Sequence, residues 1–238
     1  MNAIVAEDFY ATRADVEPDY RQAEHFLTLL DGNAENFTFQ TFDDNKARKD
    51  PTLAKVLHGS LEAYWQELYA LSRRGAGVFV TVNQTNSTGR KTADITRIRA
   101  VFQECDCPGT PEPPLKPHIV VESSPGKFHR YFLVDGGAQF NLFEGVMARM
   151  VADFDSDPNA KDRARVLRLP GFPHQKDPAN PWLVRIVEES GELPYTWSQV
   201  TAKIPPLEHT QAAPPASSGI PNPRKVQAAL CYLVPCVI

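Results

Sequence analysis

The middle of the chain, residues 77–187, is a series of short runs rich in β-branched and aromatic residues. Runs of roughly four to eight such residues between turn-forming residues predict strands. The predicted strands are Gly77–Val82, Val101–Asp106, His118–Glu122, Phe128–Val134, Arg165–Leu169 and Trp182–Val187. The turn at 123–127 predicts a hairpin, and a helical pattern interrupts the strands from Phe140 to Asp153. This irregular order predicts an α+β or mixed α/β sheet domain and excludes a regular doubly wound fold.

Four further elements are predicted from periodicity and capping residues. They are a helix over 19–31, a strand over 36–42, a helix over 51–74 and a short helix over 92–100. The helix over 51–74 is favoured by Asp50 and Pro51, which are typical of an N-cap and a first helical position. An apolar stripe from Leu53 to Leu71 supports the same interpretation.

The composition changes after Ile204. Residues 205–223 are rich in Pro, Ala and Ser, which is typical of a linker. Residues 224–238 have the pattern of a first helix whose domain the chain does not complete. We therefore expect a catalytic domain over 1–204, a linker over 205–223 and the start of a truncated helical domain over 224–238.

The charge of the chain is unevenly distributed. A net charge of −4 argues, as an average, against a duplex DNA partner. However, residues 1–60 hold eleven acidic and six basic residues, whereas residues 161–176 hold five Lys or Arg and one acid. No apolar run approaches the roughly 20 residues that span a bilayer, and the N-terminus lacks a signal-peptide pattern. We expect a soluble cytoplasmic protein with no membrane partner.

The chain has four cysteines, Cys105, Cys107, Cys231 and Cys236. Two distant cysteine pairs leave a zinc site open as an alternative. The Cys-x-Cys spacing is shorter than that of most structural zinc pairs, so reduced thiols are favoured and no structural zinc is expected.

Glu104 and Asp106 occupy alternate positions of a predicted strand, so their carboxylates share one face. Neighbouring carboxylates repel each other, and a divalent cation such as Mg²⁺ or Mn²⁺ resolves that repulsion with hard oxygen ligands. For this pair taken alone, a strand end that dips into solvent is the favoured explanation.

Two further motifs carry polar chemistry. Lys127 and His129 follow the glycine turn and share a strand face, where they suit a triphosphate, although an ordinary hairpin turn is the plainer explanation. Asp157 is a third acid, and Arg165 and Arg168 bracket an apolar pair at a predicted sheet edge. Guanidinium groups there suit phosphates, although such a basic stretch is commonly a solvated face.

Taken together and in this order, the motifs resemble the archaeo-eukaryotic primase (AEP) superfamily, most closely the RepB-like primase domains of plasmids, phages and integrated elements. The first motif of that family falls on Glu104 and Asp106. The second falls on Ser124, Gly126, Lys127 and His129, and the third on Asp157, Arg165 and Arg168. The resemblance implies an AEP-type catalytic core with an RRM-like sheet and an N-terminal module of helices and strands.

The resemblance also implies an activity, namely metal-dependent, template-directed nucleotidyl transfer that makes primers on single-stranded DNA. Glu104, Asp106 and Asp157 would be catalytic and would hold two ions of Mg²⁺ or Mn²⁺. The groups that would bind an NTP or dNTP are Ser124, Gly126, Lys127, His129, Arg165 and Arg168. Arg90, Lys91 and Lys176 would contact the template, and a replicative helicase is an expected partner through the C-terminal region.

Three points remain open here: which residue is the third acid, what the longer side chain of Glu104 changes, and whether the chain belongs to another functional class. Asp162 competes with Asp157 for the role of third acid. Many family members have aspartate where this chain has Glu104, which is one methylene longer. The chain would also suit a non-catalytic replication initiator or DNA-binding protein that keeps the fold, or a metal-dependent nuclease.

Overall fold

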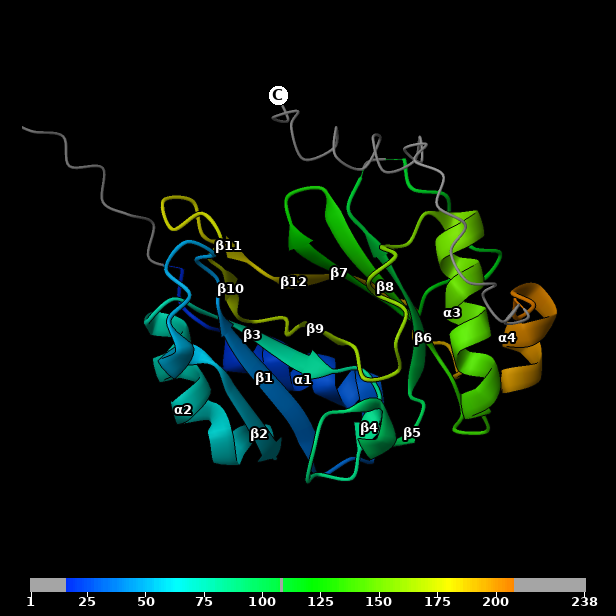
Figure 1. Cartoon of the computed structure of the whole chain (residues 1–238), viewed down its shortest axis with the longest axis horizontal. Helices are drawn as coiled ribbons and strands as arrows, with labels where there is room; N and C mark the ends of the chain where they lie inside the picture. Colours follow the sequence, from blue (N-terminus) through cyan, green and yellow to red (C-terminus); the bar gives the residue numbers. More distant parts are fainter. Residues whose placement is uncertain (1–15, 108, 208–238) are drawn as a thin grey trace, which may run out of the picture.

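Figure 1 shows a computed structural model that describes residues 16–107 and 109–207 of the chain. The helix predicted over 224–238, most of the predicted linker, Cys231 and Cys236 lie outside these residues. The described helices are α1 (Tyr20–Asp31), α2 (Leu61–Arg73), α3 (Phe140–Phe154), α4 (Trp197–Lys203) and two short 3₁₀ helices, η1 (Pro51–Leu53) and η2 (Thr92–Asp94). The described strands are β1 (Phe37–Asp43), β2 (Lys55–Gly59), β3 (Ala76–Thr81), β4 (Gln84–Thr85), β5 (Ile95–Arg97), β6 (Ala100–Cys105), β7 (Ile119–Ser124), β8 (Lys127–Leu133), β9 (Val166–Arg168), β10 (Pro173–His174), β11 (Trp182–Leu183) and β12 (Arg185–Glu189).

Two antiparallel sheets of four strands form the frame of the described residues (Figure 1). The first sheet has the order β2-β1-β3-β9, and the second has the order β12-β7-β8-β6. Two further sheets, β4-β5 and β10-β11, have two strands each. Helices and antiparallel strands therefore share one domain, which confirms the predicted α+β class.

Helix α1 joins the two sheets through one hydrophobic core. Its N-cap Asp19 accepts a hydrogen bond from the backbone N–H of Gln22, and its buried residues recur at helical spacing, as predicted. The Phe26 ring contacts Tyr131 of β8, with ring centroids 5.3 Å apart. The same apolar cluster contains Phe39 of the first sheet, so the core is continuous between the sheets.

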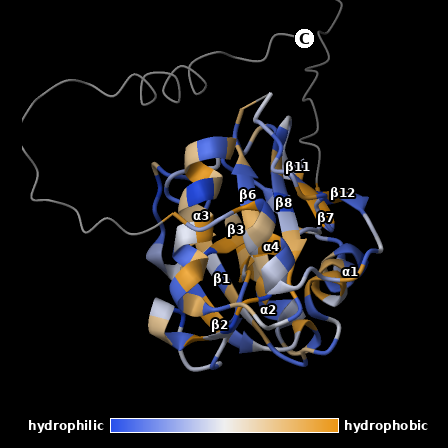
Figure 2. Ribbon diagram, turned by 90° about the vertical axis from the view of Figure 1, so that its right-hand side faces the viewer, coloured by the Kyte–Doolittle hydropathy of each residue, from blue (hydrophilic) through white to orange (hydrophobic). Residues whose placement is uncertain are grey.

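Helix α3 packs beside β6 and carries hydrophobic residues on its buried face (Figures 1 and 2). Its Phe143 ring lies 6.4 Å from that of Phe102 in β6. Gly145 leaves space for the chain that returns after α4, and the backbone N–H of Leu207 donates to its carbonyl oxygen over 3.0 Å. The chain therefore stays in contact with α3 through the first residues of the predicted linker.

The single helix predicted over 51–74 is wrong. The segment divides into η1, β2 and α2, and Ser60 rather than Asp50 caps the long helix, through a hydrogen bond from Ala63 N–H. The residues of β2 pair antiparallel with β1, from Phe37 opposite Gly59 to Thr41 opposite Lys55. Pairing with a neighbouring strand satisfies the backbone of this segment and so overrides its helical spacing.

The short helix predicted over 92–100 is also wrong in most of its length. Only η2 is helical, and β5 follows it directly and pairs with β4. No helix in the described ranges is long and apolar enough to cross a membrane.

Candidate active site

The two acids of the first motif lie opposite the two basic residues of the hairpin. Glu104 of β6 pairs directly with His129 of β8, and directly paired residues share a sheet face. The distance from His129 Nε2 to Glu104 Oε1 is 3.8 Å. At the end of the same strands, Lys127 Nζ lies 3.4 Å from Asp106 Oδ1. Strand alternation therefore brings these four residues together at one end of the second sheet.

Asp157 reaches this end of the sheet through the chain that follows α3. Helix α3 ends at Phe154, and the left-handed backbone of its C-cap Asp155 (φ 49°) turns the chain toward β6. The backbone N–H of Asp157 then donates to the Glu104 carbonyl over 3.2 Å, and Glu104 N–H donates to Ser156 Oγ. The structure thus places the third predicted acid beside the first.

The three acids concentrate negative charge around Glu104. Burial, followed by the charges of Asp157 and Asp106, raises the pKa of Glu104 to about 7. Carboxylate oxygens under mutual repulsion fit a hard divalent ion in charge and in donor type. Within the described ranges, however, no three His, Cys, Asp or Glu side chains converge closely enough to form a complete metal site. Further ligands would have to come from water or from a bound phosphate.

His129 is buried and uncharged. Burial, followed by the positive charge of Arg168, lowers its pKa to about 3. Its Nδ1 atom is buried without a hydrogen-bond partner. The neighbouring His174 is held through Nδ1 by the Ser123 carbonyl over 2.9 Å, and burial lowers its pKa to about 4. Both rings therefore act as neutral hydrogen-bonding groups around neutral pH.

The glycine turn between β7 and β8 leaves open space above it. Gly126 adopts a positive φ of 71°, and no atom lies within 4 Å of the position that a Cβ would take. Its backbone N–H donates to Glu122 Oε1 over 3.2 Å, and Ser124 beside it is half-buried. The turn predicted at 123–127 is confirmed.

The two arginines predicted to bind a nucleotide have different surroundings. Arg165 is half-buried and forms an ion pair with Asp162 over 3.0 Å. Arg168 is only 7% exposed, and its two terminal nitrogens donate to Asp44 over 3.0 and 2.8 Å. Its guanidinium also lies 4.7 Å from the centroid of the Phe79 ring. Asp162 is thus engaged by Arg165, and Arg168 is engaged by a buried acid.

The three predicted template residues do not form one group. Arg90 donates to the Ala164 carbonyl over 3.1 Å, which places it near the start of β9. Lys91 is exposed at the start of η2. Lys176 lies near the hairpin and Asp106, and partial desolvation, followed by the positive charges of Lys46 and Arg168, lowers its pKa.

No local sequence pattern marks several other residues around the site. Asp44 accepts hydrogen bonds from Arg168 and from the backbone N–H of Gln175, although 131 positions separate Gln175 from it. Gln175 Nε2 in turn donates to the Ser72 carbonyl. An acid in an acidic N-terminal stretch does not stand out in the sequence, and only the pairing of β3 with β9 brings it to the site.

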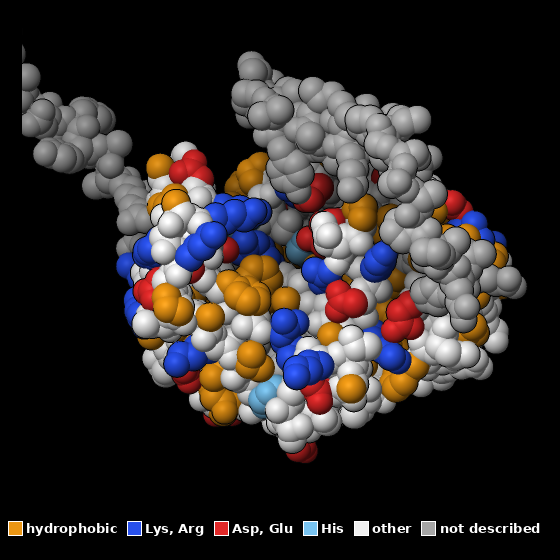
Figure 3. All heavy atoms as spheres, viewed as in Figure 1, with side chains coloured by type: hydrophobic (Ala, Val, Ile, Leu, Met, Phe, Trp, Pro, Cys, Tyr) orange, Lys and Arg blue, Asp and Glu red, His pale blue; other side chains and the backbone are white. Residues whose placement is uncertain are grey.

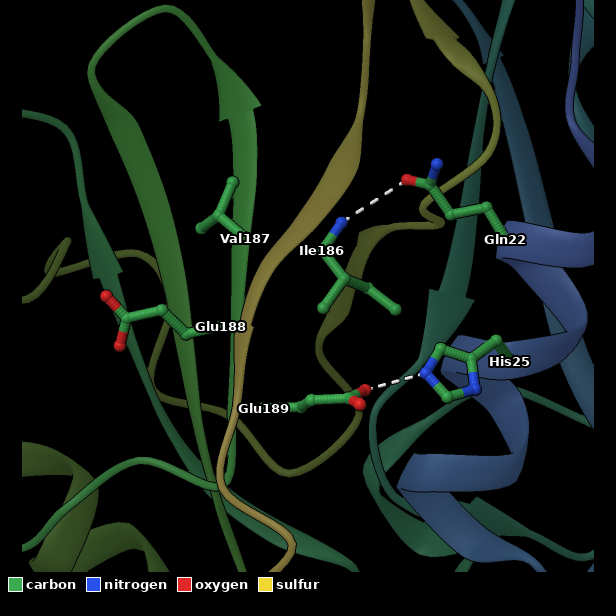
Figure 4. A pocket seen from close by; sticks show the side chains of 6 residues that line it. All are labelled: Gln22, His25, Ile186, Val187, Glu188 and Glu189. Carbon is green, nitrogen blue, oxygen red and sulfur yellow. Dashed lines mark hydrogen bonds and ion pairs between the residues drawn. The ribbon is translucent and has the colours of Figure 1, made fainter.

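A hollow of about 300 Å³ lies elsewhere, between α1 and β12 (Figure 4). Its floor is fixed by two contacts, His25 Nε2 to Glu189 Oε2 over 2.6 Å and Ile186 N–H to Gln22 Oε1 over 3.3 Å. None of the predicted site residues lines it.

Comparison with known proteins gives one family and three similar folds. Residues 112–211 match the family described as the RepB DNA-primase N-terminal domain. The archaeo-eukaryotic primase domain of the cyanophage S-2L primase-polymerase is 20% identical, with a TM-score of 0.63, over 79% of this chain and 99% of that one. The catalytic domain of primase RepB′, solved in complex with initiator DNA, is 18% identical, with a TM-score of 0.56, over 77% and 90%.

A second structure of primase RepB′ is 16% identical, with a TM-score of 0.57, over 90% of this chain and 65% of that one. No curated protein sequence matches. At these identities the structures establish a shared fold, and the predicted AEP-type architecture is confirmed. The family match covers His129, Asp157 and the two arginines of the third motif, whereas Glu104 and Asp106 precede it.

Proposed function

We propose that this chain, whose residues 112–211 match the RepB DNA-primase N-terminal domain and whose fold is shared with archaeo-eukaryotic primases, is a DNA primase or primase-polymerase of a mobile genetic element. In this proposal the chain is a cytoplasmic nucleotidyltransferase. It joins NTPs or dNTPs along a single-stranded DNA template and so makes primers. The complex of RepB′ with initiator DNA supports DNA as the partner.

One observation carries the proposal, namely the pairing of acids with basic groups across β6 and β8. Glu104 lies opposite His129, and Asp106 lies 3.4 Å from Lys127. Nucleotidyl transfer needs carboxylates to hold cations and positive or donor groups to hold phosphates, within the length of one nucleotide. This end of the second sheet provides both.

We assign the divalent ions, Mg²⁺ or Mn²⁺, to Glu104, Asp106 and Asp157. Such ions supply charge neutralisation on phosphate oxygens and activation of a primer hydroxyl. The protein would contribute the negative charge of the three carboxylates and the positions at which they hold the ions. The raised pKa of Glu104 supports this assignment, because a cation would offset both the burial and the neighbouring acids that raise it.

The other residues would bind and orient the nucleotide. Lys127 near Asp106 and Arg165 near Glu104 supply positive charge. The neutral His129 supplies one donor and one acceptor. Ser124 and the open backbone of Gly126 leave room for phosphate oxygens. The guanidinium of Arg168 is already bound by Asp44, so Arg168 would contribute its positive charge to nucleotide binding next to His129.

The test is synthesis on a single-stranded DNA template with Mg²⁺ or Mn²⁺ and labelled nucleotides, with NTPs and dNTPs in separate reactions. We expect new labelled product from the wild type, and a loss of at least about a hundredfold in Asp106→Asn, because a transition state loses charge stabilisation. Asp153→Asn, an exposed acid of α3, is the matched control and should retain activity.

Other outcomes would favour the alternatives. DNA binding that persists in chelator, with no synthesis under any condition, would favour a non-catalytic DNA-binding protein. Shortening of a labelled strand without new product would favour a nuclease.

We also propose a division of the chain into a catalytic domain over 1–204, a linker over 205–223 and a helical region over 224–238 that binds a replicative helicase. The contact of Leu207 with Gly145 favours a boundary a few residues after 204. A pull-down of the helicase by the full chain, and its loss when residues 224–238 are removed, would test this.

A further inference from the structure

The first sheet has one buried face and one partly open face. Directly paired residues share a face, and Phe39 and its partner Val80 lie buried in the core. The neighbouring row lies on the other face, where Gln40 pairs with Val56 on one side and with Phe79 on the other. We call this second face the outer face of the first sheet.

The β4-β5 hairpin covers only one end of the outer face. There, Thr38 Oγ1 of β1 lies 2.6 Å from Thr85 Oγ1 of β4. Toward the other end, Phe42 is 39% exposed and Val56 is 44% exposed. Among the described residues, these are two of the four exposed large hydrophobic side chains, and both lie on this face.

The Phe42 ring is supported by the ring of Phe79 in the neighbouring strand. It meets the Phe79 ring edge-on, with centroids 5.6 Å apart and planes at 70°. Phe79 in turn contacts the Arg168 guanidinium, which Asp44 fixes. The outermost ring of this series is therefore both exposed and supported, as a surface for a flat ligand requires.

Positive charge borders the exposed Phe42 ring. Asp44 accepts a hydrogen bond from Gln175 N–H, so the loops that carry Lys46 and Lys176 meet beside Phe42. Figure 3 shows hydrophobic side chains on this side of the molecule lying among Lys and Arg side chains. An exposed aromatic ring beside lysines suits single-stranded nucleic acid, because a base can stack on the ring while the adjacent phosphates meet the cations.

We propose that the outer face of the first sheet binds the single-stranded template, with Phe42 stacking on a base and Lys46 and Lys176 contacting the adjacent phosphates. This inference rests on the proposed function, because the template is the substrate of that reaction. It adds residues of the N-terminal module to the site, whereas the acids and the hairpin belong to the second sheet.

Fluorescence anisotropy of the full chain with labelled oligothymidylate, in EDTA and without nucleotides, tests the proposal. We expect Phe42→Ala to weaken binding about tenfold, in line with the loss of one stacked base, and Phe42→Trp to retain it. Leu193→Ala is the matched control, because Leu193 is 87% exposed on another surface. A strand of equal length with abasic central nucleotides should bind more weakly and should not distinguish Phe42→Ala from the wild type.

The proposal is overturned if Phe42→Ala binds oligothymidylate as the wild type does, if it loses affinity equally for the abasic strand, or if the wild type binds no single strand. Unchanged thermal melting of each variant excludes misfolding. The binding assay needs no catalysis, so it can be compared with the synthesis assay. Weaker binding by Phe42→Ala in a protein that makes no product would refute the proposed function and support the stacking surface. Product synthesis with no effect of Phe42→Ala on binding would support the proposed function and refute the stacking surface.

Discussion

At the scale of single residues, the pKa values of Glu104 and His129 are shifted in opposite directions for the same reason. Burial disfavours the charged form of each, so the pKa of the acid rises and that of the base falls. The pair therefore holds less charge in the free protein than its residue types suggest. A bound cation would restore the carboxylate form of Glu104.

Glu104→Gln should change how stability depends on pH in the absence of metal. The raised pKa of Glu104 favours the folded wild type below the usual value of 4.5, and this advantage is lost as the pH rises through about 7. Urea unfolding in EDTA should find the two proteins equal near pH 4.5 and the Gln variant more stable at pH 8 by about 2–3 kcal/mol.

Glu188→Gln, on the exposed part of β12, is the control and should show no such difference. Mg²⁺ should stabilise the wild type at pH 8 and should have less effect on Glu104→Gln. A pH-independent gap between the wild type and Glu104→Gln would contradict burial as the cause of the raised pKa.

Asp44 and Arg168 form a buried pair whose members depend on each other. Removing one leaves a buried charge without its partner, so Asp44→Ala should lower the free energy of unfolding by about 3–5 kcal/mol. Replacing both, as Asp44→Leu with Arg168→Met, should recover most of that loss because no charge stays buried. Asp19→Ala, which removes only the α1 cap, should cost about 1 kcal/mol in the same urea experiment.

At the scale of elements, the sequence predicts strands and helices well where local pattern and tertiary pairing agree. Helix α1 and the β7-β8 hairpin are examples, since capping and alternation there match the burial. The segment 51–74 is the counter-example, because Leu53, Leu57 and Leu61 have helical spacing in a stretch that contains a strand. Only β1, which supplies the ladder partner, decides the structure of that segment.

Gly77 of β3 lies directly beside the buried pair of Asp44 and Arg168. A Cβ at this position would lie 2.8 Å from Arg168 Nη1 and closer still to Asp44 Oδ1. Gly77→Ala should therefore lower the free energy of unfolding by about 1–3 kcal/mol and shift the thermal midpoint accordingly.

Gly137→Ala is the matched control, because its Cβ would meet only Asp135 Oδ1, at 3.4 Å. Equal melting of Gly77→Ala and the wild type would mean that the pair does not occupy the space beside β3.

At the scale of the whole molecule, the net charge of −4 says little about DNA, because the position of the basic residues matters more. The order of the motifs predicts which acids and basic residues meet, as Glu104, Lys127, His129 and Asp157 illustrate. It does not predict the positions of Asp44 beside Arg168 and of Phe42 beside Phe79, because pairing between strands far apart in the chain creates these contacts.

Lys176→Ala should reduce the salt dependence of single-strand binding. Each lysine that neutralises a phosphate releases counterions, so the slope of log affinity against log salt should fall by about 0.7. Lys203→Ala, at the exposed end of α4, should leave the slope unchanged. Anisotropy titrations over a range of salt concentrations measure both, and equal slopes for wild type and Lys176→Ala would remove this lysine from the template contacts.

The strand order of the first sheet also bears on how the chain folds. Strands β1, β2 and β3 come early in the chain, but their fourth partner, β9, follows only after α3 and three of the four strands of the second sheet, β6, β7 and β8. The edge of β3 therefore stays unpaired until a loop of more than eighty residues has closed. Contacts of such long sequence separation slow folding, and we expect the two sheets to form in one cooperative event rather than in succession.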